Sequence, residues 1–348
     1  MVFDLPSGEG VMEKSSYYSK NQLLSYNCLF NFVTGARGIG KTYQFKTWAI
    51  SDFIRTGSTC WWIMRYQTEI DTIIKDGRFF ADVLDRYPDH VFKIDGSVGY
   101  IGEGTDPKHT VWVPFITFKA LSESAIKAIS DPHCNKMVFD EFIPIPGVRY
   151  LKKEVERFLE LYFTISRGRD LRAFFLANNV TSACPYYTYF NVKPTQAEFT
   201  VDRDICIQNA RTKAFTESMR ETRFGRLIHG THYADYAVEN QSLADTDAFI
   251  TPMPQRHNLI FTIKTEYGLF NGYMCSPVML YIKKSAGETA EYVYVFDSTL
   301  HDDKTLLDFR GRYVVDVIRS YYSRALIGFS SVTEKAEFFN SVAKYLKL

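Results

Sequence analysis

The sequence predicts an α/β domain, then a short helical linker, then a smaller α+β domain. In the first two hundred or so residues, apolar runs with strand character alternate with segments of helical periodicity. The first of these strands turns at a glycine directly into a helix, which is typical of α/β folds. In the last hundred or so residues, consecutive β-rich runs precede two amphipathic helices. We therefore divide the chain into domains at residues 1–207 and 243–348, joined by a helical linker at 208–242.

The turn between the first strand and the first helix carries a phosphate-binding motif. Apolar residues at 29–33 predict a buried strand, and residues 43–54 keep apolar positions at helical spacing. Between them, residues 35–42 fit the pattern G-x-x-x-x-G-K-[ST] without a mismatch. Glycines let successive backbone N–H groups point at a phosphate, and the helix N-terminus adds partial positive charge. The pattern is a Walker A motif and predicts a P-loop NTPase (ASCE/RecA-like) fold.

This motif also predicts which residues bind ATP. The eight expected residues are Gly35, Ala36, Arg37, Gly38, Ile39, Gly40, Lys41 and Thr42. Lys41 would reach the β- and γ-phosphates, and the Thr42 hydroxyl would be a ligand of Mg²⁺.

The segments that follow continue the alternation of strands and helices. Residues 59–64 predict a second buried strand, and residues 68–87 predict a helix that runs through Gly77 and stops at Pro88. Two β-like runs between residues 91 and 118 predict a hairpin inserted on this domain. A short helix is expected at residues 120–129.

A second motif consists of a short apolar strand that ends in Asp140 and Glu141. An apolar strand ending in Asp-Glu is a weak signal alone, but roughly a hundred residues after a P-loop it is typical of a Walker B segment. Asp140 would hold the Mg²⁺ shell, directly or through water. Glu141 would orient and deprotonate the attacking water, because this task needs a carboxylate beside the γ-phosphate.

Three arginines, Arg167, Arg169 and Arg172, lie between the next predicted helix, at residues 149–165, and the strand at 173–177. In ring-forming NTPases an arginine at a subunit edge stabilises transition-state charge in the neighbour's site. We expect Arg167, or else Arg169, to act in this way; the alternative is a pair of surface arginines favoured by the helix dipole. Asn178, at the tip of the strand, would sense the γ-phosphate through the lytic water or simply form a turn.

The rest of the chain predicts an edge strand, the linker and the second domain. Residues 199–207 alternate like an edge strand that closes the first domain. Arginines of the linker form a basic face that is either solvated or in contact with a phosphate backbone or a partner. An antiparallel meander is predicted at residues 258–267, 269–275, 278–284 and 291–297, followed by helices at 304–326 and 333–346.

Composition and charge exclude several classes of protein. A hydrophobic content of 46% excludes global disorder. The formal charge is +1, so any DNA contact must come from local patches or from a ring that sums several subunits. No apolar run approaches the length of a membrane span and no signal peptide is evident, so we expect no membrane association. The scattered cysteines, without a C-x-x-C pair, indicate reduced thiols in a cytoplasm.

Together, the motifs resemble the genome-packaging ATPases of φ29-like tailed bacteriophages. The resemblance rests on LFNFVTGARGIGKTY at 29–43, VFDEF at 138–142, the arginine-rich segment before an Asn-tipped strand, and ETRFGRLIHGTHY at 221–233. The last stretch is not a general NTPase feature. Coverage runs through the first domain and the linker, and more weakly through the C-terminal domain.

This resemblance implies a homomeric, pentameric ring docked at the portal (connector) vertex of an empty prohead. The ring would translocate double-stranded DNA inward at the expense of ATP. A scaffold packaging RNA between portal and ATPase is also implied, as is a location in the host cytoplasm, transiently docked on the prohead and absent from the mature virion. Arg167 best fits the family's trans-acting arginine, although the spacing to the following strand is one residue shorter here and leaves Arg169 open.

The family's C-terminal domain is similar to an RNase H-like terminase nuclease that has lost its chemistry. Active members hold two metals with a cluster of acidic residues. In this chain Glu266 and Asp297 lie near strand ends, and Asp302 and Asp303 lie in a loop. Because these carboxylates make no convincing set, we expect a vestigial nuclease that grips or docks DNA without cleaving it.

Three other functions stay open. A terminase subunit that also cuts DNA is disfavoured by the missing carboxylate cluster. A nucleotide-gated DNA clamp with little turnover would have no need of Glu141 as a base. A P-loop kinase for small molecules is least favoured, because Glu141 suits activation of water better than transfer to a metabolite.

Overall fold

The computed structural model describes residues 17–123, 131–144, 150–178, 184–192, 197–231, 249–308 and 313–346. The chain divides into two compact units, Met1–Val180 with Pro194–Gln241, and Thr181–Lys193 with Ser242–Leu348. The helices of the expected linker therefore group with the first unit. Residues 181–193, which the sequence placed in the first domain, group with the second unit.

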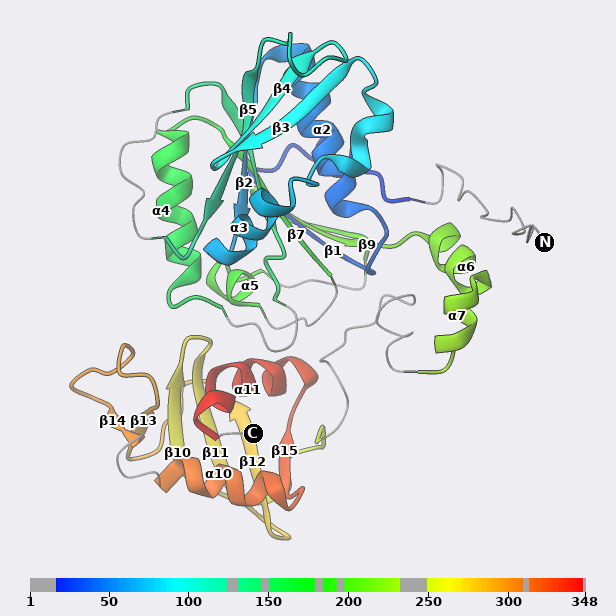
Figure 1. The fold of residues 1–348 in the computed structure, drawn as a ribbon. Helices are drawn as coiled ribbons and strands as arrows, with labels where there is room; N and C mark the ends of the chain where they lie inside the picture. Colours follow the sequence, from blue (N-terminus) through cyan, green and yellow to red (C-terminus); the bar gives the residue numbers. More distant parts are fainter. Residues whose placement is uncertain are drawn as a thin grey trace. The chain divides into compact units, whose positions relative to one another are not determined.

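A nine-stranded sheet forms the centre of the first unit, in the order β3-β4-β5-β2-β6-β7-β1-β9-β8 (Figure 1). The strands are β1 (Phe30–Gly35), β2 (Thr59–Met64), β3 (His90–Asp95), β4 (Val98–Glu103), β5 (Val113–Ala120), β6 (Cys134–Asp140), β7 (Arg172–Asn178), β8 (Phe199–Asp202) and β9 (Ile205–Ala210). From β5 to β9 in this order, neighbouring strands are parallel. The carboxyl ends of β2, β6, β7 and β1 therefore lie along one edge of the sheet.

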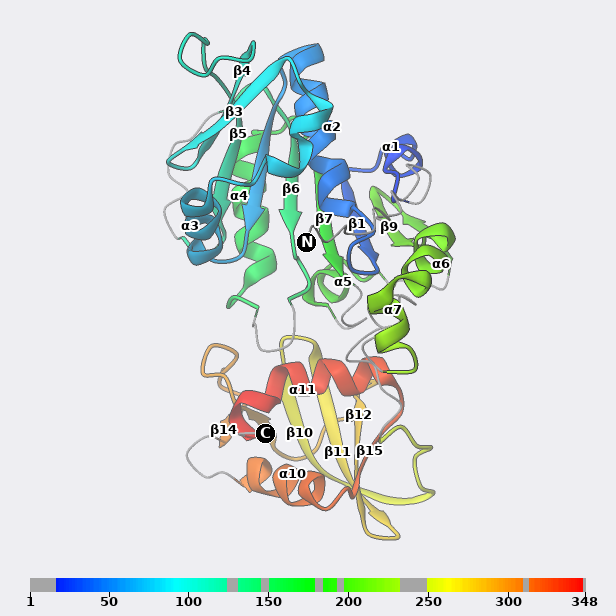
Figure 2. The ribbon, with the colours of Figure 1, turned by 45° about the vertical axis from the view of Figure 1, so that its right-hand side comes forward.

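Helices cover both faces of this sheet (Figures 1 and 2). The helices of this unit are α1 (Asn21–Ser25), α2 (Lys41–Thr56), α3 (Gln67–Asp76), α4 (Glu154–Ser166), α6 (Lys213–Glu221) and α7 (Arg223–Ile228), with a 3-10 helix, η2 (Ala81–Arg86); α6 and α7 lie beyond the β9 side of the sheet. Phe45 of α2 packs on Phe174 of β7, and Phe158 of α4 packs on Phe175. Because successive strand residues point to opposite faces, α2 and α4 lie on opposite sides of the sheet. This is the expected α/β P-loop NTPase fold.

Some predicted elements of the first unit are wrong in detail. The helix expected at 68–87 ends at Asp76, because Gly77 adopts a left-handed conformation with φ of 66°, and η2 follows separately. The strand expected at 199–207 is a hairpin of β8 and β9, and β9 is not at the edge, because it pairs with β1. Of the helix expected at 120–129, Ala120 belongs to β5, and residues 124–130 lie outside the described part. The helix expected at 149–165 begins at Glu154.

A six-stranded sheet forms the second unit, in the order β14-β13-β10-β11-β12-β15. Its elements are α5 (Pro185–Tyr189), β10 (Arg256–Thr265), β11 (Gly268–Ser276), β12 (Met279–Lys284), β13 (Val293–Val295), β14 (Leu306–Leu307), α10 (Tyr313–Ser323), β15 (Ile327–Phe329) and α11 (Val332–Leu346). Helices α10 and α11 lie side by side and share one core with the sheet (Figure 2).

The predicted meander holds for β10, β11 and β12, which are antiparallel. It is wrong for the fourth strand, because β13 crosses back and pairs parallel with β10. The outer side of β12 is taken by β15, which the sequence did not reveal. The order β14-β13-β10-β11-β12 is that of the expected RNase H-like sheet. Among the helices that the structure describes, none has both the length and the hydropathy that crossing a bilayer requires.

Candidate functional site

Residues of both motifs meet at the carboxyl ends of β1, β6 and β7. In the pairing of β1 with β7, Gly35 lies opposite Asn178. Lys41, the first residue of α2, joins the two strand ends: its Nζ donates to the carbonyls of Gly35 and Ala36 at 3.0 and 2.8 Å and to Asn178 Oδ1 at 3.2 Å. The lysine predicted to bind phosphate thus contacts the polar residue predicted at the neighbouring strand tip.

The glycine loop is packed from its outer side by two aromatic rings. Gly38 and Gly40 have φ of 84° and 92°, a region that side chains other than glycine rarely adopt. A ring carbon of Phe215, from α6, lies 3.4 Å from where a Cβ on Gly38 would be, and a ring carbon of Tyr17 lies 3.5 Å from the same point on Gly40. Helix α6 of the expected linker is therefore in direct contact with the P-loop.

Thr42 and Asp140 present two oxygen atoms to a common point. The Thr42 hydroxyl donates to Asp140 Oδ1 at 3.2 Å. Neighbouring ligands in a magnesium octahedron with bonds of about 2.1 Å lie about 3 Å apart. Hydroxyl and carboxylate oxygens are also the ligands that Mg²⁺ prefers, so the two side chains fit this ion.

Burial shifts the ionisation of Asp140 and Lys41. Burial, and then the charge of Glu141, raises the pKa of Asp140 to about 6, although the Thr42 hydrogen bond and nearby lysines oppose this shift. Burial also lowers the pKa of Lys41 to about 7, against the attraction of Asp140 and Glu141. A charged ligand that pairs with either group would favour its ionised form.

Glu141 follows β6 directly in a left-handed conformation, with φ of 58° and an exposed side chain. Its carbonyl oxygen accepts a hydrogen bond from Arg65 Nη1 at 2.9 Å, and the next carbonyl, of Phe142, accepts one from Arg65 Nη2 at 2.7 Å. Arg65 also forms a two-pronged ion pair with Glu154, through Nε at 2.8 Å and Nη2 at 3.0 Å. Both side chains of this pair are 1% exposed.

Sequence reasoning missed this pair. The available signal was an arginine directly after the apolar run at residues 60–64, which is an unusual place for a charge unless it is paired.

Both candidate arginines lie at the opposite edge of the sheet, between the end of α4 and the start of β7. Arg169 is occupied there: its guanidinium donates to the carbonyls of Asp131, Pro132, Cys134, Ile165 and Ser166. The side chain of Arg167 is exposed, on a residue with φ of 46°. The structure therefore brings neither arginine to the P-loop of its own chain.

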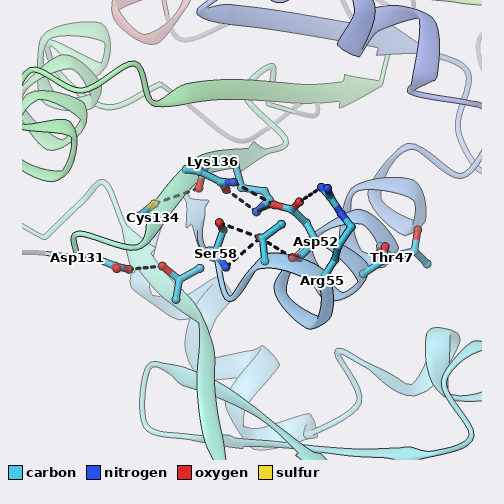
Figure 3. A network of polar contacts seen from close by, with 11 residues as sticks. Thr47, Asp52, Arg55, Ser58, Asp131, Cys134 and Lys136 are labelled. Atoms are coloured by element: carbon cyan, nitrogen blue, oxygen red, sulfur yellow. Dashed lines mark hydrogen bonds and ion pairs between the residues drawn. The ribbon is translucent and has the colours of Figure 1, made fainter.

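A second buried ion pair lies near this amino edge and is shown in Figure 3. Lys136, near the start of β6, donates to Asp52 Oδ2 of α2 at 2.7 Å, and the two side chains are 0% and 5% exposed. Asn135 and Arg55 also donate to the Asp52 carboxylate, at 3.0 and 2.7 Å. This network holds α2 on the sheet at the end away from the glycine loop.

In the second unit, Glu266 and Asp297 line one small pocket together with Lys264, Thr265 and Tyr345, among others. Lys264 forms an ion pair with Asp302 at 2.5 Å. Within the described ranges, no group of three or more His, Cys, Asp or Glu side chains is placed to hold a metal ion.

The model of the family described as Podovirus DNA encapsidation protein (Gp16) matches residues 12–344. The chain belongs to this family. The family resemblance found in the motifs is thereby confirmed.

Similar proteins occur in Bacillus phages. The chain is 30% identical over 332 residues to a DNA packaging protein of Bacillus phage phi29, covering 92% of this chain and 95% of that protein. It is 34% identical over 266 residues to the DNA packaging protein of Bacillus phage PZA, covering 75% of each.

Two solved structures extend the likeness. A chain of the bacteriophage Phi-29 viral genome packaging motor assembly matches with a TM-score of 0.71 and 27% identity over 95% of this chain and 98% of that one. The crystal structure of the N-terminal domain of the DNA packaging ATPase from bacteriophage phi29 matches with a TM-score of 0.50 and 31% identity, covering 57% of this chain and 98% of that domain.

Proposed function

We propose that this protein is an ATPase that drives double-stranded viral DNA into a preformed prohead, as a homomeric ring at the portal vertex. The observation that carries the proposal is the meeting of Lys41, Asp140 and Asn178 at one sheet edge, in a chain of a DNA encapsidation family. The relatives named as DNA packaging proteins, and the packaging motor assembly that the chain resembles over most of its length, support the same function.

Lys41 and the backbone N–H groups of the loop at 35–42 would bind the phosphates of ATP. On binding, the Lys41 ammonium would exchange the carbonyls of Gly35 and Ala36 for phosphate oxygens, which are stronger acceptors because they are charged. Thr42 and Asp140 would hold Mg²⁺, which supplies positive charge to the transferred phosphoryl group. Asn178, already within hydrogen-bond distance of Lys41, would then be free to contact the γ-phosphate or the lytic water.

Glu141 is the proposed general base. Its side chain is exposed at the end of β6, next to Asp140, and so faces the solvent from which the attacking water comes. The carboxylate would accept a proton from this water as its oxygen attacks the γ-phosphate.

Arg167 is the better candidate for the trans-acting arginine. Both residues are exposed, but Arg169 would have to give up several backbone hydrogen bonds before it reached another subunit, whereas no such bond holds the Arg167 side chain to the described residues. An arginine at the amino edge serves no site in its own chain, but it can complete the carboxyl-edge site of a neighbour in a ring. We propose a pentameric ring that meets the portal, the prohead and a scaffold packaging RNA in the host cytoplasm.

The second unit is proposed to grip or dock DNA without cutting it. Glu266 and Asp297 line one pocket and are, of the described residues, the two carboxylates that could hold a metal there. A third nearby carboxylate, Asp302, forms an ion pair with Lys264 instead. Two-metal nucleases need a larger set of carboxylates.

The first test is steady-state ATP hydrolysis with Mg²⁺, titrated with long double-stranded DNA. Removing the base by Glu141→Gln should lower turnover by about 10²- to 10⁴-fold. The matched control is Glu160→Gln, the same change at an exposed residue of α4, which should leave turnover unchanged. DNA recovered from the reactions should be uncut on a gel.

Turnover of Glu141→Gln equal to that of the wild type would contradict the assigned base and favour the nucleotide-gated clamp. Cleaved DNA would favour the terminase with nuclease activity.

A further inference from the structure

Glu141 adopts a backbone conformation that its own side chain disfavours. A residue other than glycine with φ of 58° is strained, and such a residue persists only where the surrounding structure determines its conformation. Nothing in the local sequence DEF supplies that constraint, since neither neighbour is a glycine or a turn former. The constraint must therefore come from another part of the fold.

Two contacts from neighbouring strands supply it: the Phe142 N–H donates to the Leu176 carbonyl of β7 at 3.1 Å, and Arg65 binds from the side of β2. β2 lies beside β6 in parallel register, so Arg65, which follows β2, is level with the residues that follow β6. Its guanidinium donates to two successive carbonyls, those of Glu141 and Phe142, at 2.9 and 2.7 Å. Two hydrogen bonds from one planar group fix the orientation of the two successive peptide groups that carry these carbonyls.

Glu154 holds the guanidinium in place from the other side. Its two carboxylate oxygens accept from Arg65 at 2.8 and 3.0 Å, and one of them also accepts from the Leu151 N–H at 2.8 Å. The rings of Phe139 and Tyr150 lie 5.4 and 5.3 Å from the guanidinium carbon. Because the pair is buried, Arg65 acts on the reaction through the backbone that carries Glu141.

We propose that Arg65 and Glu154 are positioning residues that hold Glu141 in the conformation needed to activate water. This inference rests on the role proposed above for Glu141. It predicts a defined kinetic pattern. Loss of the Arg65–Glu154 pair should lower kcat and leave nucleotide affinity nearly unchanged, because the P-loop follows β1, whereas Arg65 follows β2.

The test compares Arg65→Lys and Arg65→Gln with the wild type in the full-length protein. Misplacing a catalytic group by about 1 Å costs about 10²-fold in rate. We expect Arg65→Gln to lower kcat by about that factor, with KM and the Kd of a fluorescent ADP analogue each changed by less than about threefold. Arg65→Lys, which keeps the charge but loses the fork of donors, should recover part of the lost kcat.

The matched control is Lys136→Gln, which breaks the other buried ion pair of the same sheet, at the edge away from the site. Arg65→Gln leaves the buried Glu154 carboxylate without its ion-pair partner, and Lys136→Gln leaves Asp52 with the exposed Arg55 as its remaining cation, so both variants should lower the melting temperature. Only the Arg65 variants should lower kcat. An equal loss of kcat in Lys136→Gln, or unchanged kcat in Arg65→Gln, would overturn the inference.

Glu141→Gln, measured in parallel, separates this inference from the proposed function. An inactive Glu141→Gln protein beside a fully active Arg65→Gln protein would overturn the positioning role alone. An active Glu141→Gln protein would overturn both, since there would be no base to position.

Discussion

Lys41 and Asp140 are opposite charges in one site, and burial moves the pKa of each toward neutrality, to about 7 and about 6. Below about pH 6, Asp140 gains a proton and loses the charge that we propose holds Mg²⁺. Above about pH 7, Lys41 loses the proton that makes it attractive to phosphate. The free protein therefore has the ideal charge state for MgATP only in a narrow range of pH.

We expect the affinity for a non-hydrolysable MgATP analogue to pass through a maximum between about pH 6 and 7, with proton uptake on binding above this range. Calorimetry in buffers of different ionisation enthalpy measures both quantities. Asp140→Asn should abolish the loss of affinity below about pH 6 that protonation of Asp140 causes. The effect of Asp140 is thereby separated from that of nucleotide protonation. Affinity that is independent of pH from 5 to 9 would contradict the assignment of both groups.

Residue by residue, the sequence was informative where chemistry imposes a fixed spacing. Lys41 and Thr42 follow from a contiguous pattern, and Asp140 follows from the end of a strand. Arg65 and Glu154 could not be predicted, because their contact depends on the register of β2 against β6 and on where α4 begins. No local pattern encodes that register. The roles of these residues stay predictions until the variants are measured.

Elements were predictable in kind but less so in partner and extent. Hydrophobic period shows that residues 291–297 form a strand, but it does not show that β13 pairs with β10 rather than with β12. The same limit explains why β9 was placed at the edge of its sheet. Two glycines determine where helices end or pack closely. Gly77 ends α3, and Gly225 allows α7 to approach the end of α6.

The two glycines differ in a way that a stability measurement can resolve. A Cβ on Gly77 would meet no atom within 4 Å, so Gly77→Ala carries only the cost of its left-handed backbone, about 1 kcal/mol. A Cβ on Gly225 would lie 1.8 Å from the Met219 carbonyl oxygen, so Gly225→Ala must separate α6 from α7. We expect it to lower the stability of the first unit by about 2 kcal/mol or more.

Urea unfolding followed by circular dichroism would give both differences. Equal losses for the two substitutions would show that the contact between α6 and α7 is not tight in solution.

For the whole molecule, the separation of Arg167 from the P-loop of its own chain makes subunit mixing informative. Arg167→Ala subunits keep an intact site and lack the arginine, whereas Lys41→Ala subunits keep the arginine and lack the site. Each variant alone should be nearly inactive. In rings assembled from an equal mixture, about a quarter of the interfaces pair an intact site with an intact arginine, so hydrolysis should partly return. No recovery would show that Arg167 does not act between subunits.

Helix α4 has a consequence for the order in which the proposed subunits hydrolyse ATP. Its first residue, Glu154, is bound through Arg65 to the carbonyl of Glu141, and the residue after its end is Arg167. A helix of 13 residues is short and stiff, so its two ends move as one body. With the roles proposed here, a subunit that repositions its base on hydrolysis also moves the arginine it lends to the next subunit. A single helix would then couple hydrolysis at one site to the position of the arginine at the next, so that the sites of the ring hydrolyse ATP in order.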